Sequence, residues 1–219
     1  MPNWCYTEYV FKGNPEEIDL FHQKIDEWAK DDPDSPFHVD NDFGDSWLGN
    51  IVNNCMQDPE AYNSTRCRGT LQYNDVLEPG RLSITTETAW CAAPLMWLAI
   101  LKKLRLESIK MAFYEEEPGW GLFNIYDPED IAFSNNDYQV EVFDDAPKEL
   151  EEVEGMVSEV ELKRVINKLI PGKGSLDSKI EEICDTYEDV SINKIDRINS
   201  PEELWDMYAE DGELEVEDA

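Results

Sequence analysis

Basic residues are scarce in this chain, and their scarcity is its most informative property. The 219 residues include 18 Lys and Arg against 50 Asp and Glu, so the formal net charge is -32 at pH 7. A basic stripe is the usual footprint of a protein that binds nucleic acid directly. Here basic residues cluster in sequence only at Arg66 to Arg68 and at Lys102 to Arg105. Direct nucleic-acid binding is therefore disfavoured, although a sheet can stack bases on exposed aromatic rings.

Histidines and catalytic motifs are also scarce. His22 falls beside the apolar residues of an expected helix and His38 falls in a Pro-rich loop, so both are predicted to be structural or solvated. The sequence has no Gly-x-Ser-x-Gly elbow, no Cys/His signature and no H-E-x-x-H motif. The stretch 172–175 lacks the residues of a phosphate loop and predicts a turn between helices. We expect no enzyme, no catalytic residue and no cofactor.

Carboxylates are too numerous for their proximity to indicate a metal site. Asp40, Asp42 and Asp45 could in principle bind a hard cation such as Ca²⁺ or Mg²⁺. Their spacing is not that of an EF-hand loop, and 50 acidic residues bring carboxylates together by chance. We assign no metal ligand, and a divalent-metal-dependent enzyme is kept only as an alternative.

Paired cysteines and long apolar runs are absent from the sequence. The five cysteines have no C-x-x-C spacing and are odd in number, which favours reduced structural thiols: Cys5, Cys55, Cys67, Cys91 and Cys184. No apolar run reaches 18 residues, and no basic segment precedes a hydrophobic stretch. The expectation is a cytoplasmic protein.

Apolar residues are plentiful enough for a folded core. They make up 41% of the chain, and aromatic residues make up 11%, which separates it from acidic disordered proteins. Mutual repulsion of so many carboxylates opposes compaction. We expect a folded chain that retains them to use its negative electrostatic field. The possible uses are to bind a basic surface, to repel nucleic acid or to remain soluble.

The first third of the chain predicts a strand followed by a helix. Residues 4–12 are rich in aromatic and branched side chains and stop at Gly13. Asn14 is the expected N-cap, Pro15 the first helical residue, and apolar residues recur at helical spacing until the stop at 31–33. Residues 31–66 are expected to be a loop because Pro and Gly recur there.

The middle of the chain predicts a hairpin, a helix and more strands. Two strand-like runs, 67–73 and 82–88, flank a turn at 78–80, and Pro94 opens a helix that is apolar on every side. Further strands are expected at 108–114, 121–126 and 138–143. This order predicts an α+β protein with a ferredoxin-like split βαβ antiparallel sheet and two helices on one face.

The C-terminal part is more acidic than the rest. Residues 141–219 hold 25 acidic and 8 basic residues, whereas the first 140 hold 25 and 10. Capping-box patterns begin at Ser158 and Ser200, and an apolar stripe at 176, 180, 183 and 187 favours core over interface. We predict a ferredoxin-like domain over 1–146 and an acidic helical subdomain over 147–219, with a tail from Asp206.

Several short motifs carry a family resemblance. They are Met1-Pro2-Asn3-Trp4-Cys5, Gly44 with Trp47, Thr88-Ala89-Trp90 ahead of Pro94, and Tyr114-Glu115-Glu116 with Gly119 and Gly121. Together they resemble the YubB ferredoxin-like family of phages, plasmids and conjugative elements, over about residues 1–126. The positions that depart from its pattern are Thr7, Phe43 and Ser46. The resemblance implies a ferredoxin-like fold and a mobile-element origin in a bacterial host, and brings no catalytic residues.

These observations favour an interaction protein that mimics nucleic acid. Its carboxylates would pair with the Lys and Arg of a host defence nuclease, a CRISPR effector or a restriction enzyme, and a few aromatic anchors would hold the complex. The acidic candidates are Glu115, Glu116, Glu117, Asp144, Asp145, Glu149, Glu151, Glu152, Glu154, Glu210, Asp211 and Glu213, and the aromatic candidates are Trp120 and Trp205. The alternative is an accessory domain of a mobile element whose acidity only maintains solubility.

Overall fold

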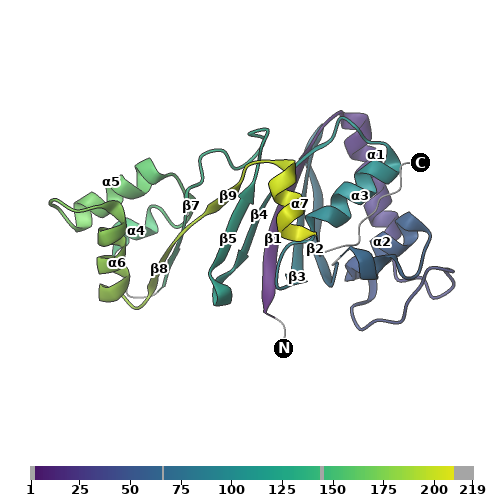
Figure 1. Cartoon of the computed structure of the whole chain (residues 1–219), viewed down its shortest axis with the longest axis horizontal. Coiled ribbons are helices and arrows are strands. Elements are labelled where there is room, and N and C mark those ends of the chain that lie inside the picture. The colour runs from purple at the N-terminus through teal and green to yellow at the C-terminus, as the bar shows by residue number, and fades with distance from the viewer. Residues whose placement is uncertain (1–2, 66, 144–145, 210–219) are drawn as a thin grey trace.

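The chain forms a mixed α+β structure with two lobes. The computed structural model describes residues 3–65, 67–143 and 146–209. Figure 1 shows the larger lobe, a sheet with helices on one side, and a smaller lobe beyond the opposite side of that sheet. No helix within these described residues is long and apolar enough to cross a membrane.

The larger lobe is built on a six-stranded mixed sheet with the order β2-β3-β1-β4-β5-β9. All of its neighbouring strands are antiparallel except β5 and β9, which are parallel. The strands are β1 (Trp4–Lys12), β2 (Gly69–Glu78), β3 (Arg81–Ala89), β4 (Lys110–Glu117), β5 (Leu122–Tyr126) and β9 (Asp196–Ile198). The predicted hairpin is confirmed, and Gly80 supplies its left-handed turn residue, with φ of 83°.

Two predicted helices, α1 (Pro15–Trp28) and α3 (Pro94–Leu104), cover one face of this sheet (Figure 1). Asn14 caps α1 as expected, because its side chain accepts a hydrogen bond from the Glu16 N–H at 2.9 Å. Trp97 of α3 makes edge contacts with Phe11 of β1 and Phe21 of α1. These rings are fully buried and form the centre of the main core.

The expectation of a continuous loop over residues 31–66 is wrong, because helix α2 (Leu48–Met56) lies within it. Its three Asn and one Gly are typical of loops. However, the buried Asn50 amide donates to the carbonyls of Ala29 at 3.1 Å and Gly44 at 2.9 Å. Apolar residues of α2, such as Ile51, pack into the main core. Tertiary contacts therefore outweigh a weak local helix signal.

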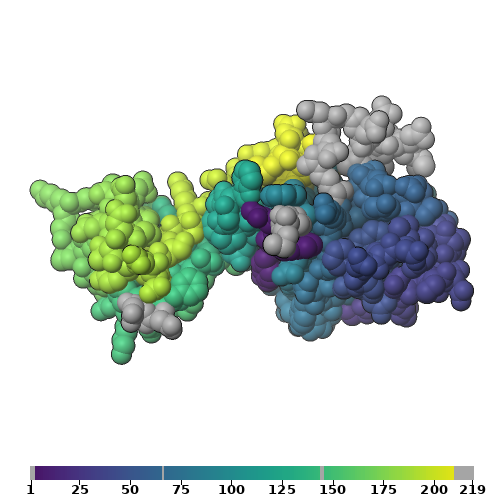
Figure 2. Space-filling view, turned by 90° about the horizontal axis from the view of Figure 1, so that it is seen from below, coloured from purple at the N-terminus to yellow at the C-terminus, as the bar shows by residue number. Residues whose placement is uncertain are grey.

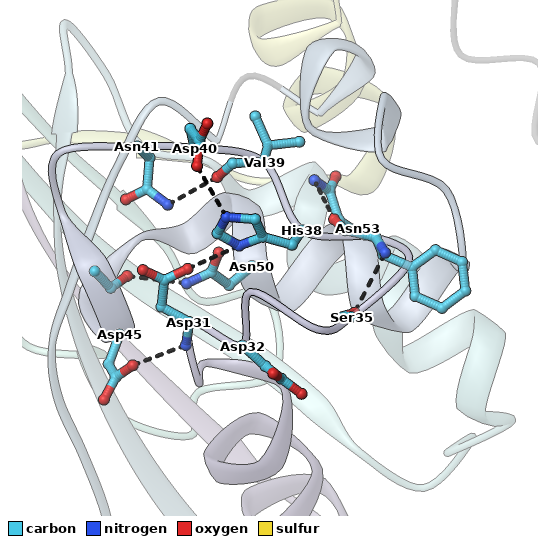
Figure 3. A network of polar contacts seen from close by, with 12 residues as sticks. Asp31, Asp32, Ser35, His38, Val39, Asp40, Asn41, Asp45, Asn50 and Asn53 are labelled. Atoms are coloured by element: carbon cyan, nitrogen blue, oxygen red, sulfur yellow. Dashed lines mark hydrogen bonds and ion pairs between the residues drawn. The ribbon is translucent and has the colours of Figure 1, made fainter.

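The loop before α2 is held by a network around His38 (Figure 3). Its ring nitrogens lie 3.0 Å from an Asp31 carboxylate oxygen and 3.2 Å from one of Asp40. Asp45 accepts a hydrogen bond from the Asp31 N–H at 2.7 Å. Two of the three carboxylates considered as cation ligands are thus engaged in holding the loop. Within the described residues, no group of three or more His, Cys, Asp or Glu could hold a metal ion.

The smaller lobe combines a three-stranded antiparallel sheet with helices. Its strands, in the order β7-β6-β8, are β6 (Tyr138–Val142), β7 (Gly155–Val157) and β8 (Val190–Lys194). Its helices are α4 (Lys148–Glu151), α5 (Glu159–Leu169) and α6 (Leu176–Thr186). The capping box at Ser158 is confirmed, and the stripe on α6 packs in the core of the lobe. The expectation of helices alone after residue 147 is wrong, because β7, β8 and β9 also lie there. Strands β7 and β9 have only three residues each, and the pairing of β8 with β6 has no local signal in the sequence.

The chain then returns to the large sheet through β9 and α7 (Pro201–Tyr208). Leu204 and Tyr208 of α7 are buried in the main core. The N-cap at Ser200 is confirmed, since its side chain accepts from the Glu203 N–H at 3.1 Å. The predicted division after residue 146 remains a prediction about folding units. The tail predicted from Asp206 begins too early, because Asp206 lies within α7 and Tyr208 is buried. The part from residue 210 lies outside the described residues.

Candidate partner-binding surface

The face of the large sheet opposite α1 and α3 is only partly covered. Along β1, side chains alternate, so that Tyr9 and Phe11 enter the main core while Trp4 and Tyr6 are exposed on the opposite face. A small apolar cluster that includes Phe133 and Ile195 covers this face over β4 and β5. The remaining part, over β1, β3 and β2, is the open face.

The strand register sets two acids of the open face in one row and three bases in another. Tyr6 lies opposite Glu87 on β3 and Glu116 on β4. At the other end of the same strands, Lys12 lies opposite Arg81 and Lys110. Directly opposed residues have neighbouring side chains. The bases are therefore gathered six residues along β1 from the row of Tyr6, Glu87 and Glu116, which we name the acidic row.

The carboxylates of the acidic row are held by neighbouring side chains. Gln72 donates to Glu87 at 3.1 Å, and the Tyr114 hydroxyl donates to Glu116 at 2.6 Å. Glu141 of the smaller lobe adds a carboxylate, and its pKa is raised by partial burial and then by the negative charge of Glu116. The acidic row therefore continues onto the smaller lobe.

Figure 2 shows the molecule from the end at which β1 begins. A notch separates the smaller lobe, in green, from the purple and blue strands of the large sheet. The open face borders this notch, because β2, β3 and the start of β1 form the part of the sheet next to it.

A pair of exposed tryptophans lies at the same end of the sheet. The rings of Trp90 and Trp120 are 6.1 Å apart and nearly perpendicular, at 85°. They are 48% and 74% exposed. The Trp90 backbone is left-handed, with φ of 76°, and its N–H donates to the Asn3 carbonyl at 3.0 Å. Such a conformation is costly for a non-glycine residue and points to a local constraint.

The run of Glu115, Glu116 and Glu117 is not the surface run expected from the sequence. Strand alternation turns Glu115 and Glu117 toward the helix-covered face, where both are buried, and leaves only Glu116 half-buried on the other face. A cluster of three acids is typical of a solvated surface. Here the period of the strand decides the placement, and in this conformation Glu115 and Glu117 lie away from the surface.

Glu115 is buried but well supplied with donors. Its carboxylate accepts from the Ala92 N–H at 2.7 Å, from the Asn124 amide at 2.8 Å and from the Tyr208 hydroxyl. The Cys5 thiol lies at 3.6 Å, and its pKa is raised by burial and by the charge of Glu115, which keeps the donating proton on sulfur. This carboxylate therefore has a structural role.

The other predicted contact residues are dispersed. Trp205 lies on α7 at the surface, and Glu149, Glu151, Glu152 and Glu154 are exposed on and after α4 in the smaller lobe. Asp144, Asp145, Glu210, Asp211 and Glu213 lie outside the described residues. Glu116, Glu117 and Trp120 thus lie at one end of the large sheet, with Glu116 and Glu117 on opposite faces, and the α4 acids lie on the other lobe.

Sequence reasoning missed Tyr6, Glu87 and Trp90 as candidate contacts. The period-2 alternation in residues 4–12 was the available signal for Tyr6, since it predicts one outward face. Strand pairing, which sets Glu87 and Glu116 on either side of Tyr6, has no local signal. No family model, no curated protein and no solved structure matches this chain.

Proposed function

We propose that this protein is an interaction protein of a phage or mobile element that blocks a basic nucleic-acid groove of a host defence nuclease. The acidic row carries the proposal, because its carboxylates flank an exposed aromatic ring and the bases of the same face lie at the opposite end. A net charge of -32 draws a basic partner toward the molecule.

The acidic row presents negative charges and an aromatic ring, as a nucleic acid does. Glu87 and Glu116 lie on strands that flank β1, so their Cα atoms are separated by roughly 10 Å. Carboxylates at this spacing can pair with Arg and Lys side chains that otherwise hold phosphates. Tyr6 between them offers a ring for cation–π contact and apolar burial. The partner's basic groove is the complementary surface.

The finer fold and the origin belong to the same proposal. The order β2-β3-β1-β4, with α1 and α3 as the two crossovers, supports a ferredoxin-like split βαβ core. Strands β5 and β9 and the smaller lobe would then be additions to that core. With the motifs in residues 1–126, this arrangement supports a relationship to the YubB ferredoxin-like family, and hence action in the bacterial cytoplasm.

The decisive experiment is DNA cleavage by a panel of purified restriction endonucleases and Cas9-type effectors, with and without the protein. We expect inhibition of at least one nuclease, relieved by excess duplex DNA and by raising salt from about 50 to about 200 mM. Inhibition that changes neither with salt nor with competitor DNA would contradict mimicry of nucleic acid. Absence of inhibition throughout the panel would favour the accessory-domain alternative.

A matched pair of variants separates the acidic row from general charge. Glu87→Gln with Glu116→Gln removes two charges from the row, and Glu181→Gln with Glu182→Gln removes two exposed charges from α6. We expect the first pair to weaken inhibition about tenfold, which corresponds to about 1.4 kcal/mol, and the second by less than about twofold. Equal effects would show that only the overall charge matters.

A further inference from the structure

Trp90 carries an exposed ring on a backbone conformation that is costly for its residue type. It directly follows β3, its φ is 76°, and it is 48% exposed. Its N–H donates to the Asn3 carbonyl at 3.0 Å, which joins the end of β3 to the residue before β1. Glycine would make the same backbone contact at a lower cost, because it adopts positive φ freely. The backbone contact therefore does not explain why the position holds a tryptophan.

The ring of Trp120, which contacts that of Trp90, is also exposed. Trp120 ends the 3₁₀ turn Pro118–Trp120 and is 74% exposed. Neither tryptophan is among the described residues that form the hydrophobic cores or pack against them. The two ring centroids are 6.1 Å apart and the ring planes are nearly perpendicular, at 85°, so the rings do not stack on each other. Flat aromatic surface is therefore left for a partner, and tryptophan is enriched among the residues that dominate binding.

The tryptophan pair lies at the end of the large sheet that carries the acidic row. Trp90 follows Glu87 by three residues, and Trp120 follows Glu116 by four. An extended chain spans at most about 3.6 Å per residue, so these Cα atoms lie no more than about 11 Å and about 14 Å apart, respectively. One groove of a partner is long enough to meet the carboxylates and the indole rings together.

We propose that the rings of Trp90 and Trp120 take the place of unstacked nucleobases in a groove that holds a single nucleic-acid strand. Such grooves bind bases on aromatic rings and on the planes of arginine side chains. A bicyclic indole offers them a flat aromatic face, as a purine does. Bases of a duplex lie parallel in a stack, whereas these two rings are perpendicular. The pair therefore fits the splayed bases of a single strand better than the stacked bases of a duplex.

The inference deepens the proposed function and rests on it for the identity of the partner. The acidic row would replace phosphates of the strand, and the tryptophan pair would replace bases. Among the proposed nucleases, this favours a CRISPR effector, which stabilises a displaced single strand, over a restriction enzyme that holds a duplex. The left-handed backbone of Trp90 is accounted for as the means of holding its ring beside that of Trp120.

The first test uses the full chain and two peptide probes with the chemistry of such a groove. Acetyl-Arg-Tyr-Arg amide offers a ring for stacking between two cations, and acetyl-Arg-Ala-Arg amide lacks the ring. The indole N–H signals of Trp90 and Trp120 are followed by NMR and assigned with the Trp90→Gly and Trp120→Ala variants. We expect saturable shifts of both signals with the tyrosine peptide, and binding of the alanine peptide at least about threefold weaker. No saturable shift, or equal binding of the two peptides, would overturn the proposal.

Variants separate a role in binding from a role in the fold. Trp90→Gly permits the left-handed backbone and removes the ring, and Trp120→Ala removes the other ring. Each should reduce the preference for the tyrosine peptide, whereas Trp205→Ala, on α7, should keep it. Because the Trp90 ring is exposed, Trp90→Gly should melt within about 2 °C of the unsubstituted chain. A much lower Tm, or an unchanged preference in both variants, would count against the proposal.

The second test uses a nuclease that the protein inhibits. A single-stranded oligonucleotide should relieve inhibition at a lower concentration than a duplex of the same length, and Trp120→Ala should weaken inhibition at least about fivefold. More effective relief by the duplex would overturn the proposal.

The two proposals fail separately. Preference for the tyrosine peptide without inhibition of any nuclease would leave the stacking site in place and remove the proposed function. Inhibition by a protein that binds the two peptides equally would do the reverse.

Discussion

The Tyr208 hydroxyl donates a hydrogen bond to the carboxylate of Glu115, which lies 93 residues earlier in the chain. The same carboxylate also accepts from Ala92, just ahead of α3, and from Asn124 of β5. One buried acid therefore joins β4, β5, α7 and the segment that precedes α3. This contact fixes the last described helix to the sheet after the chain has passed through the smaller lobe.

Replacing Tyr208 with Phe tests this contact. The variant leaves a buried carboxylate short of one donor, so we expect the free energy of unfolding to fall by about 2 kcal/mol and Tm by about 4–8 °C. Urea and thermal unfolding measure both. Tyr73→Phe is the control, because Tyr73 is exposed and its hydroxyl, among the described residues, bonds only to Asp75. Its change should stay within about 0.5 kcal/mol. Similar losses in the two variants would mean that Glu115 does not depend on Tyr208.

Local signals in the sequence were sufficient for elements with distinct ends. Asn14 with Pro15, and Ser158 with Glu161, give the starts of α1 and α5, because cap chemistry involves neighbours within four residues. Helix α2 and strands β7 and β8 were missed. They depend on contacts that are distant in sequence, such as the Asn50 amide with the Ala29 carbonyl and the pairing of β6 with β8.

The candidate surface was predictable only in part. Acidity and tryptophan content are visible in the composition, and Trp120 and Glu116 do lie at one end of the sheet. Burial of Glu115 and Glu117 follows from strand alternation over Lys110–Glu117, which a run of acids conceals. The row of Tyr6, Glu87 and Glu116 follows from the register among three strands, and no pattern within one segment specifies that register.

Alkaline pH should destabilise the fold through its buried thiols. Burial raises the pKa of Cys67 to about 11 and that of Cys55 to about 12, from an ordinary value of 9.0. Below pH 9 both the folded and unfolded chains keep these protons, so their contribution to stability is fully present. Above it the unfolded chain loses them first, and each group lowers the free energy of unfolding by about 1.4 kcal/mol per pH unit until its folded pKa is reached.

Urea unfolding at about pH 8 and about pH 10 measures this loss. The Cys67→Ala variant is the control for one thiol. It removes that group from the titration, so the decrease between the two pH values should be smaller by about 1.4 kcal/mol, whatever the variant's stability at neutral pH. An unchanged decrease in the variant would show that Cys67 does not titrate on unfolding.

His38 should keep the loop before α2 in its ordered conformation. Replacing it with Ala removes both carboxylate contacts, at 3.0 Å to Asp31 and 3.2 Å to Asp40 (Figure 3). We expect faster hydrogen exchange across residues 31–45 with little change in the large sheet, since local opening needs only these contacts to be lost. His22→Ala is the control, because His22 contacts Asp26 on the same helix at 3.6 Å and holds no loop. Unchanged exchange in the His38 variant would refute the role.

Tyr6 and its flanking acids should affect different rate constants of partner binding. Exposed charges mainly accelerate encounter, whereas an aromatic side chain buried by the partner mainly slows dissociation. For a nuclease that the protein inhibits, Tyr6→Leu should raise the dissociation rate about three- to tenfold and leave association nearly unchanged. Glu87→Gln with Glu116→Gln should instead lower the association rate and its dependence on salt.

Surface plasmon resonance at two salt concentrations resolves both rates, and Val160→Ala on α5 is a control for exposed apolar area. If Tyr6→Leu and Val160→Ala dissociate at the same rate, the acidic row is not where the partner is held, because an anchor at its centre could not be lost without consequence.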